Sequence, residues 1–235
     1  MASGSSPTVG REVTDGVGWI SAGFVNCYTF REGEELYLID TGFRKKATPV
    51  VRAFETANVP LGRVGKVLLT HHHFDHRGGA AYLRESTQAP LACHNDDVPY
   101  VDGRAKAPLP LLMRLFAHAR PAPVATVLKE GDPVGPLRVV HTPGHTPGEV
   151  AFYHPARKIL FSGDSVVERK GQLTLPGVRV ASDLDQAVRS LDRLRELETE
   201  VLLPGHGVPV TRGIASLLDD LIRRAPSEFL GRARA

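Results

Sequence analysis

The run of residues 71–76 carries the strongest chemical signal in the chain. Four potential metal ligands lie within six positions, namely His71, His73, Asp75 and His76. In an extended chain, successive side chains point to opposite faces. We therefore expect His71, His73 and Asp75 to share one face. His72 is expected to point away from that face, and His76 follows directly at a glycine-containing turn.

This spacing predicts a metal site rather than a set of unrelated histidines. A single histidine is more often a surface or core residue than a ligand, but a His-x-His-x-Asp-His run at a strand end is typical of metal binding. An expression tag is another source of consecutive histidines, but tags lie at chain termini and lack the interposed Phe74 and Asp75. One zinc ion takes about four ligands. Together with three later residues, His145, Asp164 and His206, the run offers more ligands than one ion requires.

Three later residues complete the candidate site. They are His145 in HTPGHTPGE, Asp164 in FSGDS and His206 in LLPGHG. Each follows an apolar run and sits in a glycine-containing turn, where the backbone can present a side chain at the edge of a sheet. We predict a site for two divalent metal ions. Zinc is the expected metal, and iron and manganese stay open because ligand types alone do not fix the metal.

The elements that must position these residues repeat along the chain. The first half reads as a strand pair ending at Asp40, a helix and a buried strand, at residues 28–42, 47–59 and 64–70. The second half reads as a strand, a helix and a strand, at residues 157–165, 182–197 and 199–207. Each half has the order strand, Asp, helix, strand, His, which predicts an internal duplication. Chance similarity of short strands is the alternative, but order and terminal chemistry both repeat.

The helix at 182–197 has the clearest periodicity. Its apolar residues fall on one face at helical spacing, namely Leu184, Val188, Leu191 and Leu194. Ser182 is the predicted N-cap. Further helices are predicted at 80–86 and 213–225.

Together, these motifs resemble the metallo-β-lactamase-fold hydrolase superfamily. The resemblance covers nearly the whole chain and lies in THHHFDHRGG at 70–79, PGHTPG at 143–148, SGDS at 162–165, PGHG at 204–207 and LIDTG at 38–42. It implies an α/β fold that is a four-layered αββα sandwich with pseudo-twofold halves. The metal site is then expected at one edge of the two packed sheets.

The resemblance also implies an assignment of ligands. It implies a first metal ion held by His71, His73 and His145, a second held by Asp75, His76 and His206, and Asp164 as the bridge between them. Asp40 is expected to orient a ligand, because such carboxylate partners fix the tautomer of a metal-binding imidazole.

The stretch 98–125, between the two halves, is a candidate lid over the site. It is rich in Pro, Ala and Arg, and irregular loops often carry function. A helix packed on the core is the alternative. Its centre, 111–119, predicts a short helix whose apolar residues could line an acyl pocket, namely Leu112, Leu115 and Phe116. His94 is also assigned to the substrate pocket, with a surface loop as the alternative.

Such a site predicts hydrolysis. Two divalent ions about 3.5–4 Å apart can hold one hydroxide between them and lower its pKa toward 7. We hypothesise that this bridging hydroxide attacks an ester-type bond of a small-molecule substrate, with Asp75 as the proton shuttle. The ligand set does not separate carboxylic esters, thioesters and lactones.

Other functions of this fold remain as alternatives. A mononuclear iron persulfide dioxygenase is the main one, and the retained set of seven ligands favours the binuclear hydrolase over it. A noncatalytic binding module is disfavoured, because no ligand position has been lost. Only 29 residues (235 minus 206) follow His206, which makes the glutathione-binding region of glyoxalase II-like thioesterases doubtful. β-Lactamases that use two zinc ions do not keep an aspartate like Asp164.

Length and composition set the remaining expectations. The chain has 235 residues, of which 42% are hydrophobic, and we expect a disordered tail at 1–10 and one domain at 11–235. The net charge is +3 and the basic residues are scattered, so no nucleic-acid partner is predicted. Two cysteines, no secretory signal and no long apolar run favour a cytoplasmic protein without a membrane partner. A homodimer stays open, because apolar residues within 98–125 could form an interface.

Overall fold

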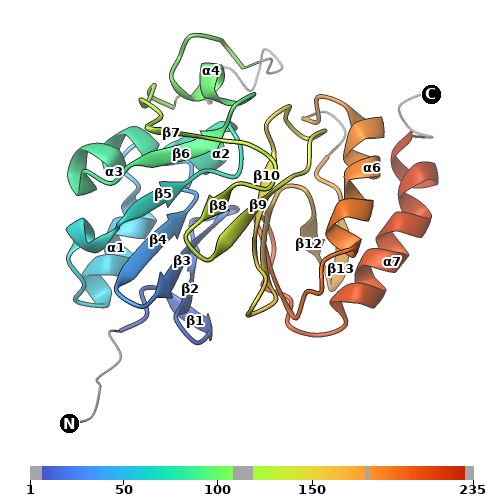
Figure 1. Ribbon diagram of the computed structural model, residues 1–235, viewed down its shortest axis with the longest axis horizontal. Coiled ribbons are helices and arrows are strands. Elements are labelled where there is room, and N and C mark those ends of the chain that lie inside the picture. The colour runs from blue at the N-terminus through green and yellow to red at the C-terminus, as the bar shows by residue number, and fades with distance from the viewer. Residues whose placement is uncertain (1–6, 108–118, 178–179, 231–235) are drawn as a thin grey trace.

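The computed structural model describes residues 7–107, 119–177 and 180–230. Two large β-sheets pack face to face, and helices cover the outer face of each (Figure 1). Each half of the chain forms one sheet together with the helices that cover it. This is the four-layered αββα sandwich that the sequence predicts.

The first sheet has seven strands in chain order. They are β1 (Arg11–Thr14), β2 (Val17–Ser21), β3 (Asn26–Glu32), β4 (Glu35–Ile39), β5 (Lys66–Leu68), β6 (Leu91–His94) and β7 (Thr126–Leu128). The helices of this half are α1 (Thr48–Thr56), α2 (Phe74–Arg77), α3 (Ala80–Thr87) and α4 (Val98–Val101), with a 3-10 turn at Leu61–Arg63. Strands β4 to β7 pair in parallel, so their carboxyl ends meet at one edge.

The second sheet has five strands in the order β14-β11-β10-β9-β8. They are β8 (Pro133–Val134), β9 (Leu137–His141), β10 (Val150–His154), β11 (Ile159–Gly163) and β14 (Val201–Pro204). A separate hairpin is formed by β12 (Val167–Arg169) and β13 (Gln172–Thr174). The helices of this half are α6 (Leu184–Arg195) and α7 (Ile214–Ala225), followed by a π-helical turn at Pro226–Leu230. β11 and β14 are parallel, so both strands deliver their following residues to one edge.

Alternation along the strands sorts apolar side chains into separate cores. On β4, Leu38 packs against the helices of the first half, whereas Tyr37 and Ile39 pack against the second sheet. On β11, Phe161 faces the first sheet and Leu160 faces α6 and α7. Each fully buried Leu or Phe contributes about 1.5–3 kcal/mol. Because both faces of each sheet are covered, the strands read as continuous apolar runs.

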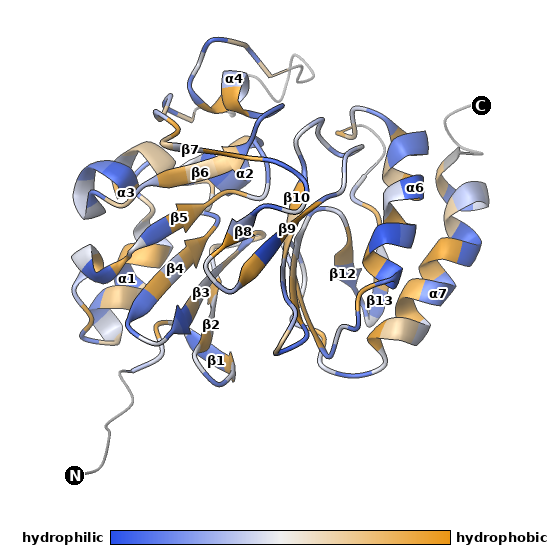
Figure 2. Cartoon of the chain, viewed as in Figure 1, coloured by the Kyte–Doolittle hydropathy of each residue, from blue (hydrophilic) through white to orange (hydrophobic). Residues whose placement is uncertain are grey.

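Helices α6 and α7 are amphipathic. Hydrophobic and hydrophilic residues occur on each of them, whereas the strands are mainly hydrophobic (Figure 2). Leu191 and Leu194 of α6 and Leu218 and Leu221 of α7 are buried, which explains how both helices pack on the second sheet. These helices have 12 residues each. In the part of the chain that the structure describes, no helix has the length and apolar character to cross a membrane.

The predicted N-cap of α6 is wrong by one residue. Asp183 caps the helix, because its Oδ1 accepts a hydrogen bond from the backbone N–H of Gln186 at 2.9 Å. Ser182 instead donates its hydroxyl hydrogen to the carbonyl oxygen of Gly144 at 3.0 Å. Ser and Asp are about equally good N-caps, so the local sequence did not separate them.

Both described ends of the 98–125 segment pack on the first half. Val98, Val101 and Ala122 are buried, and the backbone N–H of Ala122 donates to the carbonyl oxygen of Val101 at 3.0 Å. The middle of the segment, which includes Leu112, Leu115 and Phe116, lies outside the described residues.

Packing begins before residue 11. Val9 is buried, and its carbonyl oxygen accepts a hydrogen bond from the hydroxyl of Thr29 at 2.6 Å. Part of the segment expected as a tail, residues 7–10, therefore packs on the first sheet.

Candidate metal centre

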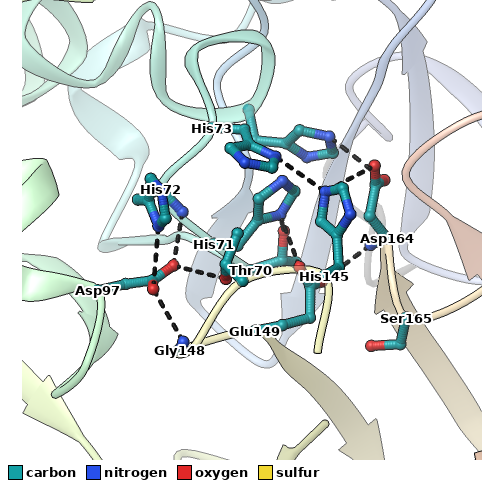
Figure 3. Close-up of polar contacts among 12 residues, drawn as sticks. Thr70, His71, His72, His73, Asp97, His145, Gly148, Glu149, Asp164 and Ser165 are labelled. Carbon is teal, nitrogen blue, oxygen red and sulfur yellow. Dashed lines mark hydrogen bonds and ion pairs between the residues drawn. The ribbon is translucent and has the colours of Figure 1, made fainter. Parts of the chain in front are cut away.

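The candidate ligands lie on loops that follow four strands. The loop after β5 carries His71 and His73, and those after β9, β11 and β14 carry His145, Asp164 and His206. The loops of the two halves meet, because the backbone N–H of Val150 donates to the carbonyl oxygen of Thr70 at 2.9 Å. Figure 3 shows the side chains of both halves pointing toward one another.

Strand alternation accounts for only part of the histidine run. Extended backbone reaches His73, and helix α2 begins at Phe74. His71 and His73 share a face, as expected. The expectation that Asp75 continues the alternation is wrong, because a helical turn places Asp75 and His76. That turn still brings both side chains to the same centre.

The ligand atoms form three groups, of which two share no residue and the third, made of His71, His76 and Asp164, joins them. Within each group, one atom from every residue lies within 4.8 Å of the others; the first group is His71, His73 and His145, and the second is Asp75, His76 and His206. Asp164 reaches both groups. Its Oδ1 lies 3.3 Å from Nε2 of His76, and its Oδ2 lies 3.5 Å from Nε2 of His145. The structure thus brings together all seven residues singled out from the sequence.

The polar atoms at this centre are better placed to bind cations than to hydrogen-bond to one another. Nδ1 of His73 and Nε2 of His145 lie 2.8 Å apart. Nε2 of His71 and Oδ1 of Asp164 are buried without a hydrogen-bond partner among the described residues. A buried polar atom without a partner costs about 1–3 kcal/mol. Imidazole nitrogen and carboxylate oxygen are ligands of zinc and related divalent ions, so bound metal would remove this cost.

The two ligand groups differ in their protonation. Burial lowers the pKa of each imidazole in the first group below the ordinary 6.5, and that of His145 to about 4. Burial also opposes a charge on His76 and His206, but the carboxylate of Asp164 and its neighbours outweigh it. They raise the pKa of His76 well above 6.5 and that of His206 to about 10. At neutral pH the metal-free second group therefore carries two protonated imidazoles.

Metal binding at the two groups is expected to release different numbers of protons. A ligating imidazole must be neutral, so at pH of about 7.5 the first group loses no proton, whereas His76 and His206 lose one each. The affinity of the second group for zinc should therefore rise with pH, and that of the first should change little. Titration calorimetry of zinc binding in buffers of different ionisation enthalpy counts the protons. Equal release at both sites would speak against this assignment.

Asp40 lies behind the second ligand group. Its Oδ2 is 2.8 Å from Nδ1 of His76 and accepts a hydrogen bond from the hydroxyl of Thr70 at 2.8 Å. Its Oδ1 accepts from the backbone N–H of Thr70 at 2.9 Å. Contact with Nδ1 favours the tautomer of His76 that leaves Nε2 free to bind a metal. Asp40 is therefore placed to orient a ligand, the role expected of it from the sequence.

Glu149 is a buried carboxyl group that sequence reasoning missed. Its Oε1 accepts a hydrogen bond from the backbone N–H of Asp164 at 2.9 Å, and its Oε2 lies 3.1 Å from Nδ1 of His71 (Figure 3). Burial, reinforced by the charge of Asp164, raises the pKa of Glu149 well above 4.5. One carboxyl group thus contacts a candidate ligand residue from each half of the chain.

Asp97 is a second buried carboxyl group that the sequence did not reveal. Its Oδ2 accepts from the backbone N–H of His72 at 2.7 Å and from the hydroxyl of Thr146 at 3.0 Å. Its Oδ1 accepts from the backbone N–H of Gly148 at 2.8 Å (Figure 3). These contacts tie the histidine run to the PGHTPG turn. Nδ1 of His72 also lies 3.0 Å from Asp97, so His72 points toward Asp97 and is in neither ligand group.

A family model described as the metallo-beta-lactamase superfamily matches residues 20–206. The chain belongs to this superfamily. The match includes both halves of the sandwich and every candidate ligand from His71 to His206.

The curated relatives of this chain include a protein named as a probable metallo-hydrolase and one named as a thioesterase. The probable metallo-hydrolase YybB of Bacillus subtilis is 27% identical over 197 residues, which are 78% of this chain and 80% of that protein. The acyl-coenzyme A thioesterase MBLAC2 of Gallus gallus is 30% identical over 223 residues, which are 83% of this chain and 79% of that protein.

Solved structures share the superfamily fold. The metallo-beta-lactamase family protein TTHA1429 of Thermus thermophilus has a TM-score of 0.74 at 22% identity, covering 92% of this chain and 81% of that chain. TTHA1623, solved in a di-iron-bound form, has a TM-score of 0.66 at 34% identity, covering 82% of this chain and 92% of that chain.

Gly205 leaves room for two of the candidate ligands. A Cβ there would lie 2.3 Å from Oδ1 of Asp164 and 2.7 Å from Cε1 of His76. We expect Gly205→Ala to lower the metal content of the purified protein, because the added carbon displaces a ligand at an overpacking cost of about 1–3 kcal/mol. Elemental analysis measures this. Gly62→Ala is the control, since its Cβ would meet nothing within 4 Å; equal metal content in both variants would refute the expectation.

A cavity of about 460 Å³ opens beside the centre. Asp75, Asp164 and His206 line its floor, and its apolar walls are formed by Phe24, Phe74, Val167, Pro176 and Val180. Phe24 also supports a ligand. Its carbonyl oxygen lies 2.6 Å from Nδ1 of His206, and its ring stacks on that imidazole with centroids 5.9 Å apart.

His94 is not among the described residues that line this cavity. Its ring stacks on His141 with centroids 4.0 Å apart, and burial together with His141 lowers the pKa of His94. Nε2 of His141 lies 2.9 Å from the carbonyl oxygen of Pro147. The structure therefore places His94 in a stacked pair between the ends of β6 and β9, away from the assigned substrate pocket.

Proposed function

We propose that this chain is a hydrolase with two metal ions that cleaves ester-type bonds, with thioesters as the preferred class. The observation that carries the proposal is the convergence of seven histidine and aspartate side chains beside a cavity with apolar walls. The first ligand group would hold one ion, the second group the other, and Asp164 would contact both. Bound there, the ions supply Lewis acidity and make water nucleophilic at neutral pH.

Asp75 is the residue we propose to carry protons. Its side chain is 14% exposed and lines the cavity, and its Oδ2 lies 3.5 Å from Nε2 of His206. Burial would raise the pKa of Asp75, but His76 and His206 together outweigh burial, and the pKa falls below 3.8. The carboxylate is therefore ionised at neutral pH. It can accept a proton from the attacking water and pass it to the leaving group.

The preference for thioesters rests on two points. The apolar walls of the cavity suit the hydrocarbon part of an acyl group. A relative at 30% identity is named as an acyl-coenzyme A thioesterase. Carboxylic esters and lactones present the same carbonyl group to the centre, so they stand beside thioesters as substrates to be tested. Zinc is the metal we propose, and the di-iron form of TTHA1623 makes iron the second metal to test.

A hydrolysis screen with metal-reconstituted protein tests the proposal. The panel contains thioesters, carboxylic esters, lactones, β-lactams and phosphodiesters, and each assay is repeated after treatment with a chelator. We expect metal-dependent hydrolysis of thioesters with the highest kcat/KM. Hydrolysis of phosphodiesters alone, or of no carbonyl substrate, would defeat the proposal.

The oxidoreductase alternative from the sequence is a persulfide dioxygenase with one iron. The donor set argues against it, because seven ligand residues exceed what one iron needs. Elemental analysis of protein purified without added metal separates the two. About two metal ions per chain support the hydrolase, and a single iron with oxygen consumption on persulfides supports the dioxygenase.

A further inference from the structure

A second cavity of about 250 Å³ borders the same histidine run. His73 and Phe74 line both cavities. The two cavities therefore share a wall at the candidate metal centre. The rest of the second cavity is formed by helix α2 and the described ends of the 98–125 segment, including Arg77, Tyr100 and Lys106.

The second cavity is positively charged, unlike the first. Arg77 and Lys106 line it, and no carboxylate does so among the described residues. By contrast, three carboxylates, those of Asp75, Asp164 and Glu168, line the first cavity together with one arginine, Arg169. Asp97 is near enough to favour the charged form of Arg77, but it does not line the cavity. The planar fork of the guanidinium matches carboxylate and phosphate groups. The charge of this cavity therefore favours an anion.

The cationic wall is held in place by hydrogen bonds. Nε of Arg77 donates to the carbonyl oxygen of His72 at 2.8 Å, and a terminal nitrogen donates to the carbonyl oxygen of Arg120 at 3.2 Å. These two bonds use two of the five N–H donors of the guanidinium. The remaining three donors have no hydrogen-bond partner among the described residues. Arg77 directly follows His76 in α2, so a bound anion would lie close to the metal centre.

His72 and Tyr100 form the polar side of the cavity. Their rings stack with centroids 4.2 Å apart. His72 is 2% exposed, and its Nε2 is buried with no hydrogen-bond partner in the described part of the chain. Its ring lines the second cavity.

We propose that the second cavity binds an anionic group, a carboxylate or a phosphate, carried on a short arm of the leaving group. This inference rests on the proposed hydrolysis. The acyl part lies along the apolar first cavity, the scissile carbonyl lies at the centre, and the thiol part extends into the second cavity. Water adds its hydroxyl to the acyl carbon, the carbon–sulfur bond breaks, and the sulfur leaves with the electron pair and takes up a proton.

A matched pair of substrates tests the inference. One is a thioester of mercaptoacetate, and the other carries the same acyl group on the methyl ester of mercaptoacetate, which is neutral. We expect a KM roughly tenfold lower for the anionic thioester, since a hydrogen bond to a charged group contributes about 1.5–3 kcal/mol. The same KM for both thioesters would overturn the inference.

Lys106→Gln is the most direct variant, because Lys106 is exposed and belongs to neither ligand group. It is expected to raise the KM of the anionic thioester by about threefold to fivefold and to leave kcat and the neutral thioester unchanged. Arg77→Lys, which keeps the charge but loses the fork, should have a larger effect of the same kind. Lys46→Gln is the control, as Lys46 is exposed and lines neither cavity. Equal changes for both thioesters would contradict an anion site.

Inorganic phosphate separates this inference from the proposed function. Its affinity for zinc-loaded protein, measured by titration calorimetry, is expected to fall by about threefold to fivefold in Lys106→Gln and to stay constant in Lys46→Gln. An affinity that Lys106→Gln does not change would mean that phosphate binds at the metal alone, and the inference would fail. If neither thioester is cleaved but Lys106→Gln weakens phosphate binding, the proposed function fails and the anion site stands.

Discussion

Asp164→Asn is expected to lower kcat/KM by more than roughly a hundredfold, a loss of several kcal/mol in transition-state stabilisation. The two carboxylate oxygens of Asp164 reach one imidazole of each ligand group, His145 in the first and His76 in the second. An asparagine keeps the volume but removes the charge and one oxygen acceptor. It cannot serve both groups as the carboxylate does, so the metal content should fall together with the activity.

Steady-state kinetics of the metal-reconstituted variant and elemental analysis measure the two effects. Asp185→Asn is the matched control, because Asp185 is exposed in the first turn of α6 and should keep both properties. An Asp164→Asn protein with full activity and unchanged metal content would remove Asp164 from the centre.

Glu149→Ala is expected to destabilise the metal-free protein by about 2–5 kcal/mol. The substitution leaves the backbone N–H of Asp164 without its buried partner, removes the carboxylate 3.1 Å from Nδ1 of His71, and opens a cavity next to both. Nδ1 of His71 keeps the Thr70 hydroxyl at 3.1 Å. Glu149→Gln retains an oxygen for Asp164 but not a second acceptor for His71. Its unfolding free energy should fall less, while zinc affinity should still drop by roughly tenfold to a hundredfold.

Urea unfolding of the metal-free variants and competition titrations with a chelator give the two quantities. Glu198→Ala is the control, because Glu198 is exposed and paired only with Lys158 among the ion pairs of the described residues. Its unfolding free energy should change by less than about 0.5 kcal/mol. If Glu149→Ala is as stable as the parent chain and binds zinc equally well, Glu149 holds neither ligand.

The ligands and the layers were predictable because both leave local patterns. His71 and His73 follow a short apolar strand, and Asp164 and His206 each follow another. Their position after a strand therefore identified them as candidates, and no tertiary contact had to be known. The layers follow from alternation and helical periodicity, as Leu38 and Ile39 on opposite faces of β4 illustrate. Such patterns depend only on residues that are close together in the sequence.

The supporting carboxylates were not predictable, because their partners are distant in the chain. Asp97 lies in the turn before α4 and accepts hydrogen bonds from the backbone of His72 and Gly148. Glu149 looks from its neighbours like a polar residue at the start of β10, yet it is buried between Asp164 and His71. Nothing in either local sequence distinguishes a buried acceptor from an exposed acid. The contact between the two sheets at this edge, where the backbone N–H of Val150 donates to the carbonyl oxygen of Thr70, forms only in the folded chain and decides it.

The α2 turn marks the limit of reasoning from periodicity. Strand alternation was extended through Asp75, but the backbone becomes helical at Phe74. A short helix of four residues leaves no repeat from which its period could be read. Both geometries place Asp75 and His76 near the centre, which is why the ligand set could be anticipated although the path of the backbone was not.

Anomalous diffraction from crystals grown with zinc tests the central claim most directly. We predict two zinc peaks in each chain, one among His71, His73 and His145 and the other among Asp75, His76 and His206, with Asp164 beside both. A single peak, no peak at these residues, or zinc bound only at the stacked pair of His94 and His141 would contradict it.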